Sequence, residues 1–145
     1  CAKQGDRIVT TSFLDFQNIK RPRSRNHWLV APEARSDADQ VAPRFALSPE
    51  QLTVHWHEVV SNQPRTRVTS VSDDRLRIEA EQRSALFRFV DVISFQAIED
   101  GDGHATFFAF SRSLSGYWDL GVNRKRLRHW VGVLSDAIGK EPVVR

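Results

Sequence analysis

Two neighbouring apolar segments constrain the fold of this chain more than any other feature. They are LFRFVDVISFQAI, residues 86–98, and HATFFAFSRS, residues 104–113. Both are rich in Phe, Val and Ile, and the intervening EDGDG contains the Gly and Asp residues typical of a hairpin turn. Because apolar residues occupy both faces of each segment, we predict two central antiparallel strands that are covered on both sides.

Two further segments, TRVTSV at 66–71 and RLRIEAEQ at 75–82, are predicted to extend this sheet, and they flank the turn residues SDD. In the second segment Leu76, Ile78 and Ala80 alternate with charged residues. That pattern indicates a strand with one apolar face and one face in water. The residues predicted to face water are Arg75, Arg77, Glu79 and Glu81.

One helix is predicted before the strands and one after them. Residues 48–64 combine Ser48 as N-cap, Pro49 at the first helical position and Gln51 as the partner of a capping box. Residues 123–140 form the second helix, which is expected to stop at Gly139. The apolar stripes are Leu52, Trp56, Val59 and Val60 in the first helix, and Leu127, Trp130, Val131, Leu134 and Ile138 in the second.

This order of elements predicts an α+β fold, with an antiparallel sheet of about four strands and two helices packed on one face. Residues 1 to about 47 are interrupted by prolines and are predicted to form a long irregular N-terminal arm. The arm either carries function or covers the edges of the sheet. Residues 1–12 are interpreted as a polar lead or anchor linker, and residues 13–145 as a single α+β domain.

The charge balance is mildly basic. The chain has 21 Lys and Arg against 18 Asp and Glu, a net charge of +3. Dedicated nucleic-acid binders usually have a stronger bias. Its apolar runs are shorter than the roughly 20 residues that cross a bilayer as a helix.

Cys1 is the single cysteine of the sequence, which contains no Met. This pattern is similar to the mature end of a bacterial lipoprotein, where a signal peptide is removed before a cysteine that carries lipid. We therefore expect palmitate or another lipid on Cys1 and a location in the cell envelope. Ala2, where an aspartate would favour the inner membrane, predicts the outer membrane facing the periplasm. A cloning boundary or a cytosolic fragment is the alternative.

Several motifs together resemble a known family. RSALFRFVDVISFQ followed by FSRSLSGYWDLGVNRKR is similar to the bacterial and plastid "domain of unknown function" family 1499. The DF at 15–16 and RPRSRNHWLVAP at 21–32 resemble the N-terminal signature of that family. The resemblance covers roughly residues 13–138. It implies the fold, no agreed activity, and frequent signal peptides or membrane anchors.

The chain departs from the family pattern at two places. Many members have a second acid directly after the Asp that matches Asp91, where this chain has Val92. Many also have Arg–Val before the Gly that matches Gly116, where this chain has Leu114 and Ser115.

The string DLGVNRKR raises an electrostatic question, because it places Arg124, Lys125 and Arg126 in the first turns of a helix. The helix dipole makes that end positive, so cations there are normally unfavourable. One explanation is structural: Asp119 or Asn123 caps the helix, and Asp119 pairs with one of the arginines.

The other explanation is functional. Backbone N–H groups near Gly121 would converge with Arg124, Arg126 and Arg112 to bind an anion. A phosphate, a carboxylate or an acidic lipid headgroup suits such a site, because arginine binds these groups with paired hydrogen bonds. The predicted anion- or partner-binding residues are therefore Arg112, Asp119, Asn123, Arg124 and Arg126.

Asp91 is a second unusual residue, because it is predicted to share a strand face with Phe87, Phe89, Ile93 and Phe95. A carboxylate on an aromatic face must be paired, or its pKa must rise. Asp91 is predicted to form a structural ion pair, with Arg112 as the expected partner.

The sequence contains few signs of catalysis or metal binding. His55 and His57 are two positions apart on a predicted helix, so they point about 200° apart and cannot chelate one ion. The sequence has no HExxH, CxxC, Gly-rich phosphate loop or nucleophile elbow. We expect no metal, no cofactor and no catalytic residues.

Three functional hypotheses follow. The first is a lipid-anchored envelope domain that binds a partner protein or an anionic lipid or cell-wall component. The second is a small-ligand binder or enzyme with an Asp/Arg site between the sheet and the C-terminal helix. The third and weakest is a cytosolic nucleic-acid binder that uses KRPRSR, RKRLRH and Trp28 or Trp130, although Trp130 belongs to the apolar stripe.

Overall fold

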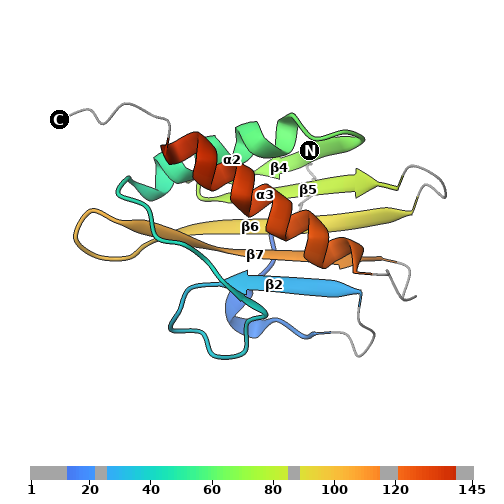
Figure 1. Cartoon of the computed structure of the whole chain (residues 1–145), viewed down its shortest axis with the longest axis horizontal. Coiled ribbons are helices and arrows are strands. Elements are labelled where there is room, and N and C mark those ends of the chain that lie inside the picture. Colours follow the sequence, from blue (N-terminus) through green and yellow to red (C-terminus); the bar gives the residue numbers. More distant parts are fainter. Residues whose placement is uncertain (1–12, 22–25, 85–88, 115–120, 140–145) are drawn as a thin grey trace, which may run out of the picture.

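The computed structural model describes residues 13–21, 26–84, 89–114 and 121–139. These residues form one six-stranded sheet in the order β3-β2-β7-β6-β5-β4, with two α-helices (Figure 1). The elements are η1 (Phe16–Asn18), β2 (His27–Ala31), β3 (Gln40–Val41), α2 (Pro49–Ser61), β4 (Thr66–Val71), β5 (Arg77–Arg83), β6 (Val90–Glu99), β7 (Ala105–Ser113) and α3 (Val122–Gly139).

The sheet is antiparallel except at one edge, where β2 and β3 run parallel. The predicted α+β class and the central hairpin β6–β7 are confirmed. The predicted number of about four strands is wrong, because β2 and β3 lie in the segment that was expected to be irregular. The strand β2 has the sequence HWLVA and lacks alternation because both of its faces are covered, and Leu29, Val30 and Ala31 are fully buried.

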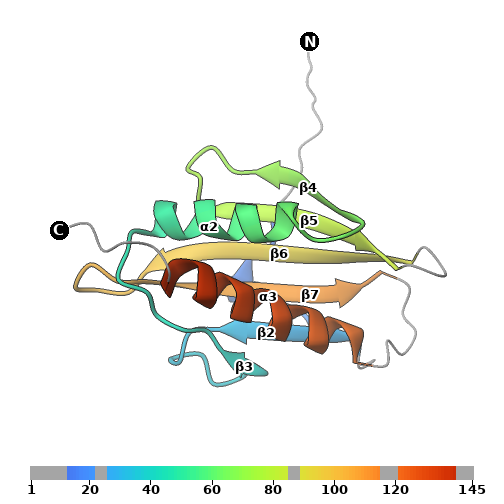
Figure 2. The same ribbon diagram turned by 45° about the horizontal axis from the view of Figure 1, so that its top comes forward.

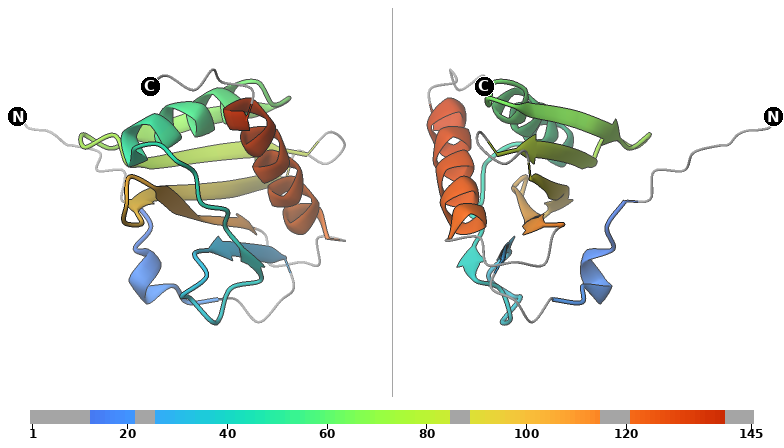
Figure 3. Two further views of the ribbon diagram at one scale, coloured as in Figure 1. Left: turned by 60° about the vertical axis from the view of Figure 1, so that its left-hand side comes forward. Right: turned by 90° about the vertical axis from the view of Figure 1, so that its right-hand side faces the viewer.

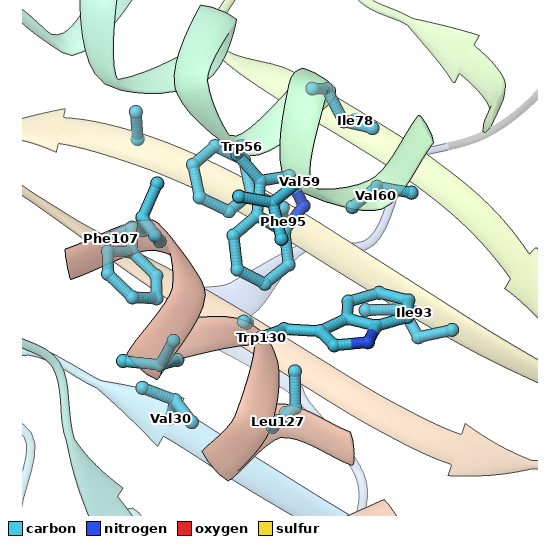
Figure 4. Close-up of a cluster of buried hydrophobic side chains, with 14 of the residues drawn as sticks. Val30, Trp56, Val59, Val60, Ile78, Ile93, Phe95, Phe107, Leu127 and Trp130 are labelled. Atoms are coloured by element: carbon cyan, nitrogen blue, oxygen red, sulfur yellow. The ribbon is translucent and has the colours of Figure 1, made fainter. Parts of the chain in front are cut away.

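Both helices lie on the same face of the sheet, as predicted (Figures 2 and 3). The core between them and the sheet is centred on Trp56 of α2, whose ring stacks on Phe95 at 4.8 Å between centroids. The ring of Trp130 on α3 packs edge-on against the ring of Trp56, with 5.9 Å between their centroids. The centroid of the Phe107 ring lies 5.8 Å from that of Trp56 (Figure 4). These aromatic contacts join α2, α3, β6 and β7 in a single core.

The opposite face of the sheet is covered in part by the segment that contains η1 (Figure 3). The ring of Phe16 stacks on Phe108 of β7 with centroids 5.2 Å apart. Asp15 caps η1, since its carboxylate accepts a hydrogen bond from the backbone N–H of Gln17. The N-terminal arm was expected to cover the edges of the sheet, whereas its residues 13–21 pack on a face of the sheet.

The predicted helix starts are found at nearly the expected positions. At α2, Ser48 and Gln51 form a complete capping box, with Pro49 in the first turn. At α3 the helix follows Gly121, whose φ of +80° is the left-handed conformation that favours glycine. The predicted cap Asp119 lies outside the described residues, as does Cys1.

Candidate functional site

The basic residues at the start of α3 separate into two groups with different surroundings. Arg126 is buried, with 8% of its surface exposed, whereas Arg124, Lys125 and Arg128 are exposed. A helix turns about 100° per residue, so these positions point to different sides of the same helix. Each group therefore has its own role.

Arg126 forms a buried ion pair with Asp91 of β6. The guanidinium Nη2 lies 2.7 Å from Oδ2 of Asp91, and the two side chains are only 6% and 9% exposed. The same guanidinium donates hydrogen bonds to Oγ of Ser111 at 3.0 Å and to Oδ1 of Asn123 at 2.8 Å, and Nε donates to Gln82. Since Asp91, Ser111 and Gln82 belong to strands of the sheet, this cation anchors α3 to the sheet.

Asn123 extends this buried network to the edge of the sheet. Its side-chain Nδ2 donates to the backbone oxygen of Asn26 at 2.8 Å and to Oγ of Ser113 at 3.0 Å. Its Oδ1 accepts a hydrogen bond from Oγ of Ser111 at 2.6 Å. The predicted helix-start residue Asn123 thus joins α3 to β7 and to the chain before β2, and it is fully buried.

The prediction that Asp91 is in a structural ion pair is confirmed, but Arg112 is not its partner. In the register of β6 and β7, Asp91 lies opposite Ser113, and Arg112 lies opposite Val92. Successive residues of a strand point to opposite faces, so Asp91 points toward the helices and Arg112 points away from them. For the same reason, an acid in place of Val92 would not join Asp91.

Arg112 lies beside Glu79 on the face away from the helices. Its Nη1 donates to Oγ of Ser94 at 3.0 Å and to the backbone oxygen of Phe110 at 3.3 Å. The guanidinium carbon lies 5.2 Å from the centre of the Phe110 ring. Burial lowers the pKa of the Arg112 guanidinium, and the nearby charge of Glu79 partly offsets this effect.

Glu79 was predicted to face water, and that prediction is wrong. Its side chain accepts hydrogen bonds from Oγ of Ser94 and, at 3.1 Å, from the backbone N–H of Leu14. The segment around Leu14 covers this face of the sheet and leaves Glu79 only 7% exposed. Burial raises the pKa of the Glu79 carboxyl, while the hydrogen bonds from Ser94 and Leu14 act in the opposite direction.

The exposed basic group lines a hollow at the start of α3. Gly121, Arg124, Lys125 and Arg128 surround a space of about 460 Å³. The guanidinium of Arg124 lies 5.3 Å above the ring of Trp28. Trp28 is itself held by a hydrogen bond of 2.8 Å from its Nε1 to Gln40. We call this surface the basic hollow.

The cations of the basic hollow have no carboxylate partner within the described parts of the chain. A second hollow of about 440 Å³ lies near the β6–β7 turn, and it differs in this respect. There the charge of Arg44 is offset by Asp100, which accepts hydrogen bonds from it through both its side chain and its backbone. Among the described residues, the lack of a carboxylate partner thus distinguishes the basic hollow from the second one.

The remaining predicted residues do not gather into a site. Among the described residues, no group of three or more His, Cys, Asp or Glu side chains could hold a metal ion. His57 lies near Ser61 on α2, with 3.3 Å between Nδ1 and Oγ. Within the same ranges, no helix combines the length and the apolar character needed to cross a membrane.

The comparison with known families agrees with the resemblance seen in the motifs. The family described as "Protein of unknown function (DUF1499)" matches residues 17–134 of the 145, and the chain belongs to this family. No curated protein matches the chain. Family membership is therefore established, while an activity must be inferred from the geometry.

Proposed function

We propose that this member of the family is a non-catalytic binding domain that recognises anionic groups through the basic hollow. The observation that carries the proposal is the set of three exposed cations, Arg124, Lys125 and Arg128, around one space without carboxylate partners among the described residues. Like charges placed together repel one another, and an anion bound between them relieves that repulsion.

Arg124 is the best positioned of these cations. Its contact with the face of Trp28 restricts the guanidinium while leaving it exposed to solvent. A guanidinium of fixed orientation loses less conformational entropy when it binds a carboxylate or a phosphate. The chemical class that fits is therefore an oxyanion, either on a partner protein or on an envelope component.

The buried polar network argues against the alternative of an Asp/Arg enzyme or small-ligand site. Such a site requires an open cleft lined by Asp91 and Arg112. Asp91 is buried against Arg126, and Arg112 lies on the other face of the sheet. The two residues therefore cannot act on one substrate.

A charge-reversal experiment tests the proposal. The variant Arg124→Glu/Lys125→Glu/Arg128→Glu is compared with Lys20→Glu/Arg67→Glu/Arg75→Glu, which changes the net charge equally at exposed positions elsewhere. Binding of soluble inorganic polyphosphate is measured by isothermal titration calorimetry at 0.15 M salt. If each contact contributes about 0.7 kcal/mol, the first variant loses about 30-fold in affinity.

The control variant should retain most of the wild-type affinity for polyphosphate. An equal loss in both variants would mean that only net charge matters, and no binding by the wild-type chain would refute the proposal. Tighter binding of a single-stranded DNA oligonucleotide than of polyphosphate, with a steep salt dependence, would instead favour the nucleic-acid alternative.

The location in the cell envelope is a separate part of the proposal. It rests on Cys1, the single cysteine of the sequence, and on the anchors implied by the family resemblance. The intact mass of the protein purified from its native membranes tests it. A diacyl or triacyl mass on Cys1 supports an envelope lipoprotein, and an unmodified thiol removes this support without affecting the anion-binding proposal.

A further inference from the structure

Exposed apolar side chains lie at the same end of the molecule as the basic hollow. Leu114, which follows β7, is 64% exposed, and Val122, the first residue of α3, is 43% exposed. Their neighbours Ser113 and Asn123 are joined by a hydrogen bond of 3.0 Å, so the backbone positions of the two apolar residues lie close together. Val122 also follows Gly121, which lines the basic hollow.

A third apolar residue and a further cation belong to this end. The backbone N–H of Leu114 donates to the oxygen of Val90 at 3.2 Å, and Phe89, next to Val90, is 36% exposed. Arg83 lies opposite Val90 in the sheet and is exposed. Apolar side chains are thus flanked by cations both at α3 and at the end of β5.

Several acidic residues lie in turns at the opposite end of the sheet. Figures 1 and 2 show the β4–β5 and β6–β7 turns at the end away from the start of α3. The exposed or half-exposed acids in these turns and between β2 and β3 are Glu33, Asp37, Asp39, Asp73, Asp74, Asp100 and Asp102. The same end also contains Arg75 in the β4–β5 turn and Arg44, which is paired with Asp100, so it carries charges of both signs.

We propose that the end of the domain formed by Leu114, Val122 and the basic hollow docks onto the surface of an anionic lipid bilayer. Leu114 and Val122 enter the headgroup region, while Arg124, Lys125 and Arg128 bind lipid phosphates. This proposal rests on the proposed function, because it names lipid phosphate as the anion that the basic hollow binds.

Two features of this end, its exposed apolar side chains and its cations, favour a bilayer over the other anionic partners. Peripheral membrane binding combines buried apolar area with electrostatic attraction to anionic lipids, and this end of the molecule presents both. The backbone of a nucleic acid gives Leu114 and Val122 little apolar surface to contact.

Co-sedimentation with vesicles tests the proposal, using phosphatidylcholine alone or with 30% phosphatidylglycerol. Two apolar variants are compared: Leu114→Ser/Val122→Ser at the docking end, and Val41→Ser/Val54→Ser as a matched control. Val41 and Val54 are 59% and 60% exposed but lie on β3 and α2, outside the docking surface. Circular dichroism and urea unfolding establish that each variant is folded.

The wild-type protein should co-sediment with the vesicles that contain phosphatidylglycerol and should not co-sediment with the vesicles of phosphatidylcholine alone. The charge-reversal variant of the basic hollow should lose about 100-fold in partition, since each basic residue near an anionic surface contributes about fivefold. The partition coefficient of Leu114→Ser/Val122→Ser onto these vesicles should be about tenfold lower than that of the wild type, while its affinity for soluble polyphosphate should be unchanged. The control should match the wild type in both assays.

Two results would overturn docking on a bilayer while leaving anion binding intact. One is unchanged vesicle partition in Leu114→Ser/Val122→Ser. The other is binding of polyphosphate or poly-glutamate without binding of vesicles, which would assign the basic hollow to a soluble or protein partner. A wild-type chain that binds neither vesicles nor polyphosphate would instead refute the proposed function itself.

Discussion

Replacing Arg126 with Met tests whether the buried polar network holds α3 on the sheet. The substitution keeps an unbranched, shorter side chain and removes the charge that faces Asp91. Ser111 and Asn123 remain hydrogen-bonded to each other, and the half-buried Gln82 can be rehydrated. Most of the cost therefore arises from the carboxylate of Asp91, whose side chain is only 9% exposed.

Loss of one partner from a buried ion pair costs about 3–5 kcal/mol in the free energy of unfolding. A domain of this size has about 5–15 kcal/mol in total, so Arg126→Met should lose a large share of its stability. Replacing both partners, as in Arg126→Met/Asp91→Leu, removes the unpaired charge, and we expect this variant to be within about 1.5 kcal/mol of the wild type.

Urea unfolding measures these free energies, with the fluorescence of the buried Trp56 and Trp130 as the signal. A double-mutant cycle with Asp91→Leu then gives the coupling energy of the pair. A cost below about 1 kcal/mol for Arg126→Met, or a double variant as unstable as the sum of the single ones, would refute the reasoning.

Three further predictions concern other parts of the fold. Burial raises the pKa of Glu79 in the folded protein above its value in the unfolded chain, so ionised Glu79 destabilises the fold. Lowering the pH from neutral toward 4.5, the ordinary pKa of a glutamate, should therefore stabilise the wild type relative to Glu79→Gln. Urea unfolding between pH 7 and 5 measures this difference, and a relative loss by the wild type would contradict it. Ser48→Ala removes the capping box of α2 and should lower stability by about 1 kcal/mol, whereas Glu50→Gln should leave it nearly unchanged. Gly121→Ala should destabilise the protein by about 1 kcal/mol because the φ of Gly121 is positive, and Gly132→Ala inside α3 should stabilise it by about 0.5–1 kcal/mol. A thermal unfolding midpoint that moves in the same direction in both variants would contradict these backbone conformations.

Patterns that arise between near neighbours in the chain could be predicted. The helix α2 was found within three residues of its predicted limits, because its capping box and apolar stripe involve residues three or four positions apart. The strand β4 was predicted at its observed limits. The hairpin β6–β7 was predicted for the same reason, since its turn and its strands are continuous in sequence.

Features of the strands that depend on distant segments were not predicted. The face of β5 that carries Glu79 looks wet in the sequence, but the chain near Leu14 covers it from 65 positions away. Strand β2 is enclosed by α3 and by the segment with Phe16, so its five residues contain no alternating pattern. Burial by a distant segment leaves no periodic trace at the residue that is buried.

The sequence by itself determined the class of the fold, the two helices, the central hairpin and the family, because local periodicity and contiguous motifs specify them. It also determined that Asp91 required a partner, since a carboxylate on an apolar strand face cannot remain unpaired. Only the tertiary structure decided that this partner is Arg126, with Arg112 on the opposite face, and that Arg124 stays exposed above Trp28. The physical reason is that strand register and helix rotation assign each side chain to a face, and both are set by packing between segments far apart in the chain.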